Sequence, residues 1–271
     1  VGKDAMTPEG TVNRAALPAI FNPEDMNALE QALRIKDKTQ AEVILLTMGP
    51  GRAADIIREG LFRGADGGVL LTDRKFAGAD TLATSYALSQ AVKKINPDII
   101  LAGRQAIDGD TAQVGPQVAE KLNIPQVTYA EEILDIQEDK LTIKRRLERG
   151  IEVVSSPMPL LITVHATAAP CRPRHAKQVM KYKSARTASE DAMPEASYFL
   201  PLEGNEHLKI AEWGVQEIGG DENGFGMAGS PTKVKKVENI VFQAKEAKKL
   251  TASDSDIDSL IVELISNHTI G

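Results

Sequence analysis

Residues 99–122 read IILAGRQAIDGDTAQVGPQVAEKL, and this stretch decides the fold. It opens with a short apolar run and continues through a loop, residues 103–115, that is rich in glycine and hydrogen-bonding side chains. It then passes into a segment with helical spacing that ends near Leu122. An apolar run followed by glycine and then by helical spacing is typical of a buried parallel strand that turns into a helix. The stretch therefore predicts one strand–loop–helix unit of an α/β protein.

The chain before this stretch repeats the same alternation. Residues 43–47 are a continuous apolar run ended by the glycines and proline of residues 49–51, the pattern of a strand buried on both faces. The expected elements are a helix over 24–38, a strand over 43–47, a helix over 52–63, a strand over 67–73, a helix over 81–95, a strand over 99–102 and a helix over about 112–122. Such alternation implies right-handed crossovers and a doubly wound, mostly parallel sheet with helices on both faces. Ligands bind such sheets beyond the carboxyl ends of the strands, which singles out the loops at Met48 and Gly103.

The pattern changes after Asn123. Residues 127–164 alternate apolar and polar side chains around turns at 138–139 and 149–150, which predicts a β-ribbon that returns to the sheet. From about Arg172 the density of apolar residues falls, and residues 184–197 have the composition of a linker. We therefore expect an α/β domain over residues 1–183, followed by a linker and an extended C-terminal arm over 184–271 that packs on something else.

Composition and charge restrict the class of protein. The formal net charge of -6 disfavours nucleic acid and anionic membranes as partners. No apolar run reaches the roughly 20 residues that span a bilayer, and the first residues have no apolar signal-peptide core. Cys171 is the only cysteine, and the four histidines stand at no metal-ligand spacing, so we expect a soluble cytoplasmic protein without a metal site.

The loop over residues 103–115 can be interpreted in two ways. Its glycines permit close approach, while Thr111, Gln113 and the first amides of the following helix can donate to phosphate oxygens. The same residue types also suit a plain strand-to-helix turn with Asp110 as the helix cap, and residue types alone do not separate the two. The position of the loop after an apolar strand, at the binding edge of the sheet, favours nucleotide binding.

Two other segments have ordinary explanations. Asn22, Pro23 and Asp25 form a helix-entry signature, although the Asp25 carboxylate could also accept ribose hydroxyls at a nucleotide site. Residues 76–85, FAGADTLATS, fit helix capping better than a second phosphate cradle. Since no nucleophile elbow, lysine-bearing phosphate loop or acid–base pair is present in the sequence, any chemistry must come from a bound cofactor.

Four motifs together resemble the β subunit of electron-transferring flavoproteins. They are residues 143–163 (IKRRLERGIEVVSSPMPLLIT), the loop over 103–115, NPED at 22–25 and GSPTKV at 229–234. The match spans nearly the whole chain, with Arg149 standing where the family usually has an acidic residue or glycine. The resemblance implies a flavodoxin-like, adenine-nucleotide-binding α/β domain that pairs with an α subunit, the C-terminal arm reaching across to that partner.

The resemblance also implies a cofactor. Simple members hold AMP in the cleft, whereas electron-bifurcating members hold a second FAD there and accept hydride from NADH. Asp25, DGDTAQVGP and FAGADTLATS resemble the bifurcating group, so we favour FAD with NAD(H) as substrate, with AMP as the alternative. The implied cofactor site, which has no catalytic side chain, comprises Asn22, Pro23, Asp25, Met48, Thr81, Thr84, Gly103, Arg104, Gln105, Ala106, Ile107, Asp108, Gly109, Asp110, Thr111, Ala112, Gln113 and Val114.

In this interpretation the heterodimer is a flavin-dependent oxidoreductase that splits electron pairs. One electron passes to the α-subunit FAD and on to an acyl-CoA or hydroxy-acid dehydrogenase, and the other passes to ferredoxin or flavodoxin. A plain AMP-holding electron carrier and a non-redox adenine-nucleotide-binding module are the rival hypotheses. The family usually opens with an apolar strand that has no counterpart at the start of this sequence, and the segment over 173–183, which resembles the dehydrogenase-docking loop, is shorter than usual.

Overall fold

The computed structural model describes residues 19–232 and 247–270, and it contains two sheets in place of the single sheet expected. The first is wholly parallel, with order β1-β2-β8, and the second is mixed, with order β3-β7-β4-β5-β6. The strands of the first sheet are β1 (Ile44–Met48), β2 (Gly67–Leu71) and β8 (Ala211–Trp213). Those of the second are β3 (Ile99–Gly103), β4 (Gln126–Ile136), β5 (Lys140–Leu147), β6 (Gly150–Pro157) and β7 (Leu160–Val164).

β1 and β3 are less buried than their apolar sequences predict. Every residue of β3 and all but one of β1 are partly exposed, and Ile44 is exposed. By contrast, all five residues of β7 are buried. The reason is pairing: within the described residues β1 pairs only with β2, and β3 only with β7, so each is an edge strand. An apolar run alone does not distinguish an edge strand from a central one.

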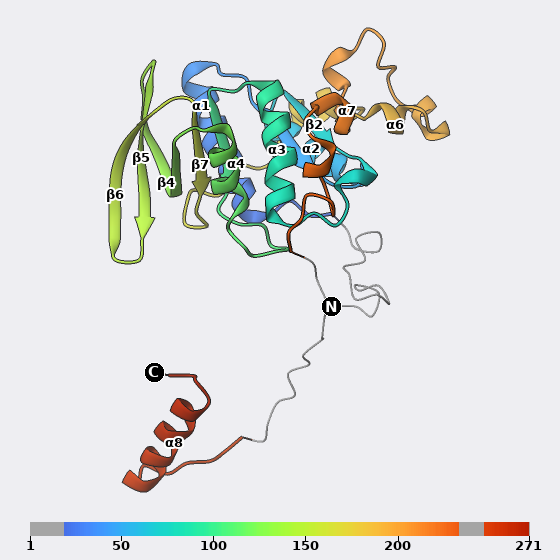
Figure 1. Cartoon of the computed structure of the whole chain (residues 1–271). Helices are drawn as coiled ribbons and strands as arrows, with labels where there is room; N and C mark the ends of the chain where they lie inside the picture. The colour runs from blue at the N-terminus through green and yellow to red at the C-terminus, as the bar shows by residue number, and fades with distance from the viewer. Residues whose placement is uncertain (1–18, 233–246, 271) are drawn as a thin grey trace.

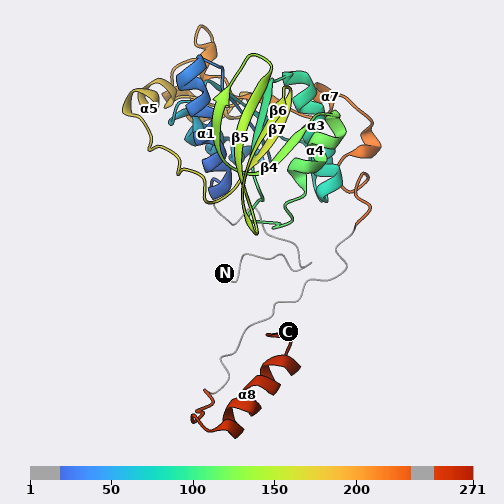
Figure 2. The same ribbon diagram turned by 90° about the vertical axis from the view of Figure 1, so that its left-hand side faces the viewer.

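Helices cover both faces of the sheets, as expected (Figure 2). They are α1 (Pro23–Thr39), α2 (Ala54–Leu61), α3 (Thr81–Ile95) and α4 (Val114–Leu122). α1 and α2 share one core cluster through Leu29, Leu33, Ile57 and Leu61, whereas α3 packs alongside α4. Asn96 and Asn123, both left-handed, end α3 and α4, a conformation that asparagine tolerates better than most residues.

The expected ribbon is confirmed (Figure 1). β4 and β5 are antiparallel, as are β5 and β6, and β7 returns to lie parallel to both β3 and β4. The first turn falls at residues 138–139, as predicted, and the second at 148–149, one residue before the predicted 149–150. Leu141 and Ile143 face the core, where they pack with Leu160 and Ile162.

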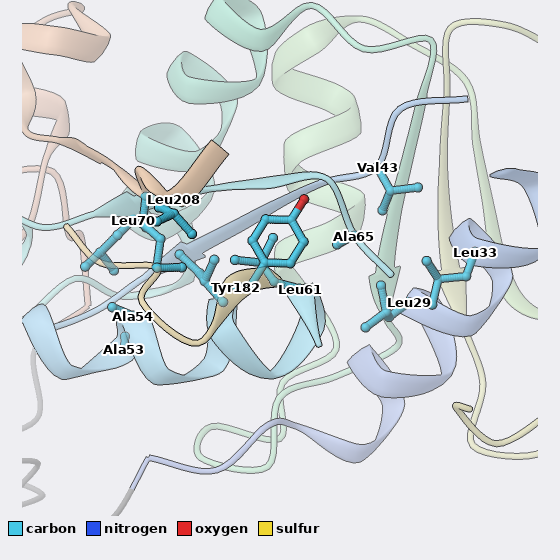
Figure 3. Packing of buried hydrophobic residues seen from close by; sticks show 13 residues of the cluster. Leu29, Leu33, Val43, Ala53, Ala54, Leu61, Ala65, Leu70, Tyr182 and Leu208 are labelled. Carbon is cyan, nitrogen blue, oxygen red and sulfur yellow. The ribbon is translucent and has the colours of Figure 1, made fainter. Parts of the chain in front are cut away.

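Residues that the sequence places in the linker and arm pack on the α/β body. Leu208 and Ile210 join Tyr182, Leu61 and Leu70 in one buried cluster (Figure 3). Val215, Ile218 and Phe225 pack against β2 and α3 in another. The packed body therefore extends past residue 183, as far as the contacts of Thr232 with Asp80.

Arginine–carboxylate pairs hold the chain that follows β7 onto α1 and α2. Arg172 donates from its backbone and side chain to Glu30, and from Nη2 to Asp37 at 2.8 Å. Arg58 on α2 makes two 2.9 Å hydrogen bonds to the Glu190 carboxylate.

The remaining elements are α5 (Ala176–Tyr182), α6 (Ala188–Asp191), α7 (Val215–Ile218), α8 (Asp254–Ser266) and the 3-10 turns η1 (Gly51–Ala53), η2 (Arg74–Phe76), η3 (Pro194–Tyr198), η4 (Glu206–Leu208) and η5 (Glu222–Gly224). None of the described helices is both long and apolar enough to cross a membrane.

Candidate functional site

The carboxyl end of β3 meets the first turn of α1. The Gly103 N–H donates to Asp25 Oδ1 at 2.5 Å, and Asn22 donates to Asp25 Oδ2 at 2.8 Å. A Cβ on Gly103 would lie 2.7 Å from the Asp25 nitrogen, so only glycine allows this approach. Residues 22–25 and 103, separated by some eighty positions in the sequence, are therefore brought together.

The next two residues of the loop are also fixed by α1. Glu24, which is buried, accepts from the Arg104 guanidinium at 3.0 Å and from the Gln105 N–H at 3.1 Å. Asn22 Nδ2 donates to the Gln105 carbonyl at 2.9 Å, whereas Asn22 Oδ1 is buried without a hydrogen-bond partner in the structure. The amide is held in this orientation because both contacts of Nδ2 are with acceptors. An unpaired buried acceptor is costly unless something donates to it.

The middle of the loop is open. Residues 106–111, which include the predicted Ala106, Ile107, Asp108, Gly109 and Thr111, are all exposed. Asp110 and Ala112 have φ of 49° and 53°, in the left-handed region that alanine rarely adopts. Left-handed residues within a turn are a component of backbone concavities that bind anions, and such strain clusters at ligand sites.

α4 begins without a capping side chain. Its N-cap residue is Gln113, which makes no side-chain cap, and Val114 is its first residue. The alternative interpretation, in which Asp110 caps this helix, is wrong, because Asp110 Oδ1 instead accepts from Gln105 Nε2 at 3.0 Å. The first N–H groups of a helix that lacks a cap are suited to an anion.

The start of α3 lies beside this helix. The capping interpretation of residues 76–85 is confirmed, since Asp80 Oδ1 accepts from the backbone of Leu82 and Ala83. Thr81 donates to Gln113 Oε1 at 3.0 Å, so Thr81 and the loop adjoin. Thr84 is partly exposed in the first turn of α3. Met48 packs against the cluster that α3 shares with β2, at the end of β1.

The segment that begins GSPT completes this region. Ser230 accepts from the Asp80 N–H at 2.8 Å, and Thr232 donates from its backbone and hydroxyl to Asp80 Oδ2. Burial by itself would raise the pKa of Asp80, but the hydrogen bonds that its carboxylate accepts from Ala83, Thr232 and Leu82 hold the pKa below its ordinary value. Residues 233–234 of the motif lie outside the described part of the chain.

The Asp25 carboxylate is electrostatically unfavourable. Burial raises its pKa, and the hydrogen bonds from Gly103 and Asn22 offset this only in part. Glu24 and Asp108 raise the pKa further through their negative charge. Asp25 thus joins α1 to the start of the loop, and its expected contact with a ribose stays a prediction.

Sequence reasoning missed a second group of residues at the same edge of the sheet. His165 directly follows β7, and its ring centroid lies 5.9 Å from that of Tyr129. The Arg104 guanidinium carbon also lies 5.9 Å from the Tyr129 centroid. The available signal for His165 was its position just after the apolar run LLITV, at the carboxyl end of a parallel strand.

An open loop, an uncapped helix start and strand ends that meet at one edge are typical of α/β proteins that hold a nucleotide. A family model described as an electron transfer flavoprotein domain matches residues 9–192. The chain is 43% identical over 228 residues to the electron transfer flavoprotein subunit beta of Clostridium acetobutylicum, covering 84% of this chain and 79% of that protein. This chain therefore belongs to the electron transfer flavoprotein β-subunit family.

Other relatives carry different names. The chain is 53% identical over 165 residues to the acryloyl-CoA reductase electron transfer subunit gamma of Anaerotignum propionicum, covering 60% of this chain and 61% of that protein. It is 38% identical over 265 residues to protein FixA of Sinorhizobium fredii, covering 95% of this chain and 85% of that protein. The family thus includes proteins named for acyl-CoA reduction as well as the FixA proteins.

Proposed function

We propose that this chain is the β subunit of an electron-bifurcating flavoprotein that holds FAD against the loop over 103–114 and takes hydride from NADH. One observation carries the proposal: the loop is open and has left-handed residues immediately before the uncapped start of α4. Backbone N–H groups arranged in this way suit a pyrophosphate without a neighbouring lysine. The Arg104 guanidinium binds Glu24, so the backbone N–H groups of the loop, and not this guanidinium, are the proposed donors to the pyrophosphate.

The residues present fit an adenine nucleotide. Asn22 Oδ1 is buried without a partner beside the loop, and an amine such as that of adenine would satisfy it. Thr111 is exposed on the loop, and its hydroxyl can donate to a phosphate or ribose oxygen. Neither feature distinguishes FAD from AMP, since both contain adenosine monophosphate.

The preference for FAD rests on the motifs. Asp25, DGDTAQVGP and FAGADTLATS resemble the bifurcating group, and the structure brings Asp25, Thr81 and Gln113 to one edge of the sheets. FAD would accept a hydride and pass on its electrons one at a time, chemistry that protein side chains do not supply. The chain's own residues bind and orient: α1 fixes the loop, and α3 with α4 borders it.

An α subunit is the proposed partner. α8 carries Ile257, Leu260, Ile261 and Ile265 at helical spacing, and all four are exposed in this chain. An amphipathic helix with an uncovered apolar face gains stability by packing on another surface. We propose that this helix is the arm that packs on the α subunit, in the cytoplasm. An acyl-CoA or hydroxy-acid dehydrogenase and a ferredoxin or flavodoxin would accept the electrons, and the acryloyl-CoA reductase relative supports the acyl-CoA choice.

The test is the cofactor content of the purified αβ complex. We expect two FAD and no AMP per heterodimer after denaturation, and loss of flavin absorbance when NADH is added without oxygen. One FAD with one AMP, and no reaction with NADH, would replace this proposal with a plain electron carrier. A stable monomer that binds ATP but no flavin and no α subunit would instead favour a non-redox nucleotide-binding module.

A further inference from the structure

Tyr129 adopts a backbone conformation that its sequence does not favour. Its φ is 61°, and the pairing register of β4 against β7 shifts between Val127 and Ala130, the interval that contains Tyr129. Against β5 the register shifts just beyond it, between Ala130 and Glu132. A left-handed tyrosine is rare because its Cβ crowds the backbone, and such strain concentrates where a side chain must point in a particular direction. The irregularity leaves the Tyr129 side chain at the carboxyl edge of β7, and 37% of the residue's surface is exposed.

The Tyr129 ring has two neighbours, Arg104 and His165, that can each contact a planar aromatic ligand. Arg104 lies near the ring, and its guanidinium is already fixed by Glu24. The position of His165 is also fixed, because its Nδ1 lies 2.9 Å from the Thr167 hydroxyl oxygen and 3.2 Å from the Thr167 backbone nitrogen. Thr167 in turn donates to the buried Glu131, which accepts from Arg146 at 2.5 Å.

From this geometry we infer that Tyr129, His165 and Arg104 form a stacking subsite for a planar heteroaromatic ring of the nucleotide bound at the loop. The inference rests on the proposed nucleotide-binding function. Arg104 belongs both to the loop and to the aromatic group, so a ligand on the loop can reach Tyr129. A planar ring gains from contact with a tyrosine face and a guanidinium, whereas a phosphate gains nothing from the negatively polarised face of the tyrosine. The ring is adenine or isoalloxazine, which share this chemistry.

The experiment uses the αβ complex stripped of the nucleotide in the β cleft and titrated calorimetrically with AMP and, separately, with FAD. The variants are Tyr129→Gly and Tyr129→Asn, which both tolerate a left-handed backbone, and Tyr129→Phe, which keeps the ring. The matched control is Tyr198→Gly, because Tyr198 is 89% exposed. Thermal unfolding of each variant verifies that the fold is retained.

We expect Tyr129→Gly and Tyr129→Asn to weaken binding about 5- to 100-fold, with Tyr129→Phe and Tyr198→Gly close to the unmodified complex. Loss for both AMP and FAD identifies the ring as adenine, and loss for FAD alone identifies isoalloxazine. Unchanged affinity for both ligands in folded Tyr129→Gly or Tyr129→Asn would overturn the subsite alone. An unmodified complex that binds neither ligand would overturn the proposed function and the subsite together.

Discussion

Replacing Gly103 with alanine tests the contact on which the loop depends. The added Cβ would lie 2.7 Å from the Asp25 nitrogen, 2.8 Å from the Glu24 carbonyl carbon and 2.9 Å from Asp25 Oδ1. Two of these atoms belong to the backbone of α1 and cannot rotate away. Relief therefore requires β3 and the start of α1 to separate, which lengthens the hydrogen bond from Gly103 to Asp25.

Two effects set the size of the loss. Overpacking of this kind costs about 1–3 kcal/mol, and a hydrogen bond to a charged group contributes about 1.5–3 kcal/mol, of which part survives if the bond only lengthens. We expect Gly103→Ala to lower the free energy of unfolding by about 2–5 kcal/mol. That is a large share of the roughly 5–15 kcal/mol typical of a folded domain.

The assay is urea unfolding, with Gly109→Ala as the matched control. A Cβ on Gly109 would meet nothing within 4 Å, so this variant should stay within about 0.5 kcal/mol of the unmodified protein. The midpoint should fall for Gly103→Ala at an unchanged slope. Equal midpoints for the two variants would refute the close approach of β3 and α1.

Three further predictions concern other regions. Asp25→Ala should weaken retention of the β-site FAD and spare the α-subunit FAD, and equal release of both would count against Asp25 in this site. Phe225 is 2% exposed, so Phe225→Ala should lower the free energy of unfolding in urea by about 3–5 kcal/mol, whereas the control Tyr198→Ala should change it little. An equally small change for both variants would show that residues beyond 183 do not belong to the core. Burial would raise the pKa of Glu30, but hydrogen bonds from Arg172 and Arg34 hold it below the ordinary 4.5. The stability that ionised Glu30 contributes is therefore present above about pH 4.5 and is lost as the pH falls through the lowered pKa. The Glu30→Gln variant should therefore lose stability less steeply in acid than the unmodified protein. Identical pH profiles of unfolding stability for the two proteins would contradict this.

Local patterns predicted local structure well. Alternation and turn residues located the ribbon, and Asn22–Pro23 marked the start of α1 within one residue. Burial was harder to predict, because β1 has the sequence of a central strand but pairs on one side only in the described chain. The late core was missed for a related reason: Leu208 and Phe225 stand in short, isolated apolar positions, and only tertiary packing buries them.

The candidate site was predicted by position better than by role. The sequence singled out Gly103, Asp25 and Thr81, and the structure pairs Gly103 with Asp25 and Thr81 with Gln113. Asp110, which the alternative interpretation made a helix cap, instead accepts from Gln105. Hydrogen bonds between distant segments decide such roles, and no local pattern encodes them. His165 was set aside because a lone histidine has no spacing to interpret, and only the return of β7 to the sheet brings it near Tyr129.

The first turn of α1 and the start of the loop are joined by hydrogen bonds to three successive loop residues, so the position of one constrains the other. The far end of the same helix is tied to Asp66, the residue just before β2, because Lys36 donates to its carboxylate at 2.6 Å. A rotation or shift of α1 caused anywhere along its length would thus change the shape of the loop before any ligand arrives. Ligand affinity in this protein should be adjustable from residues that never touch the ligand, and α1 is the place to begin engineering it.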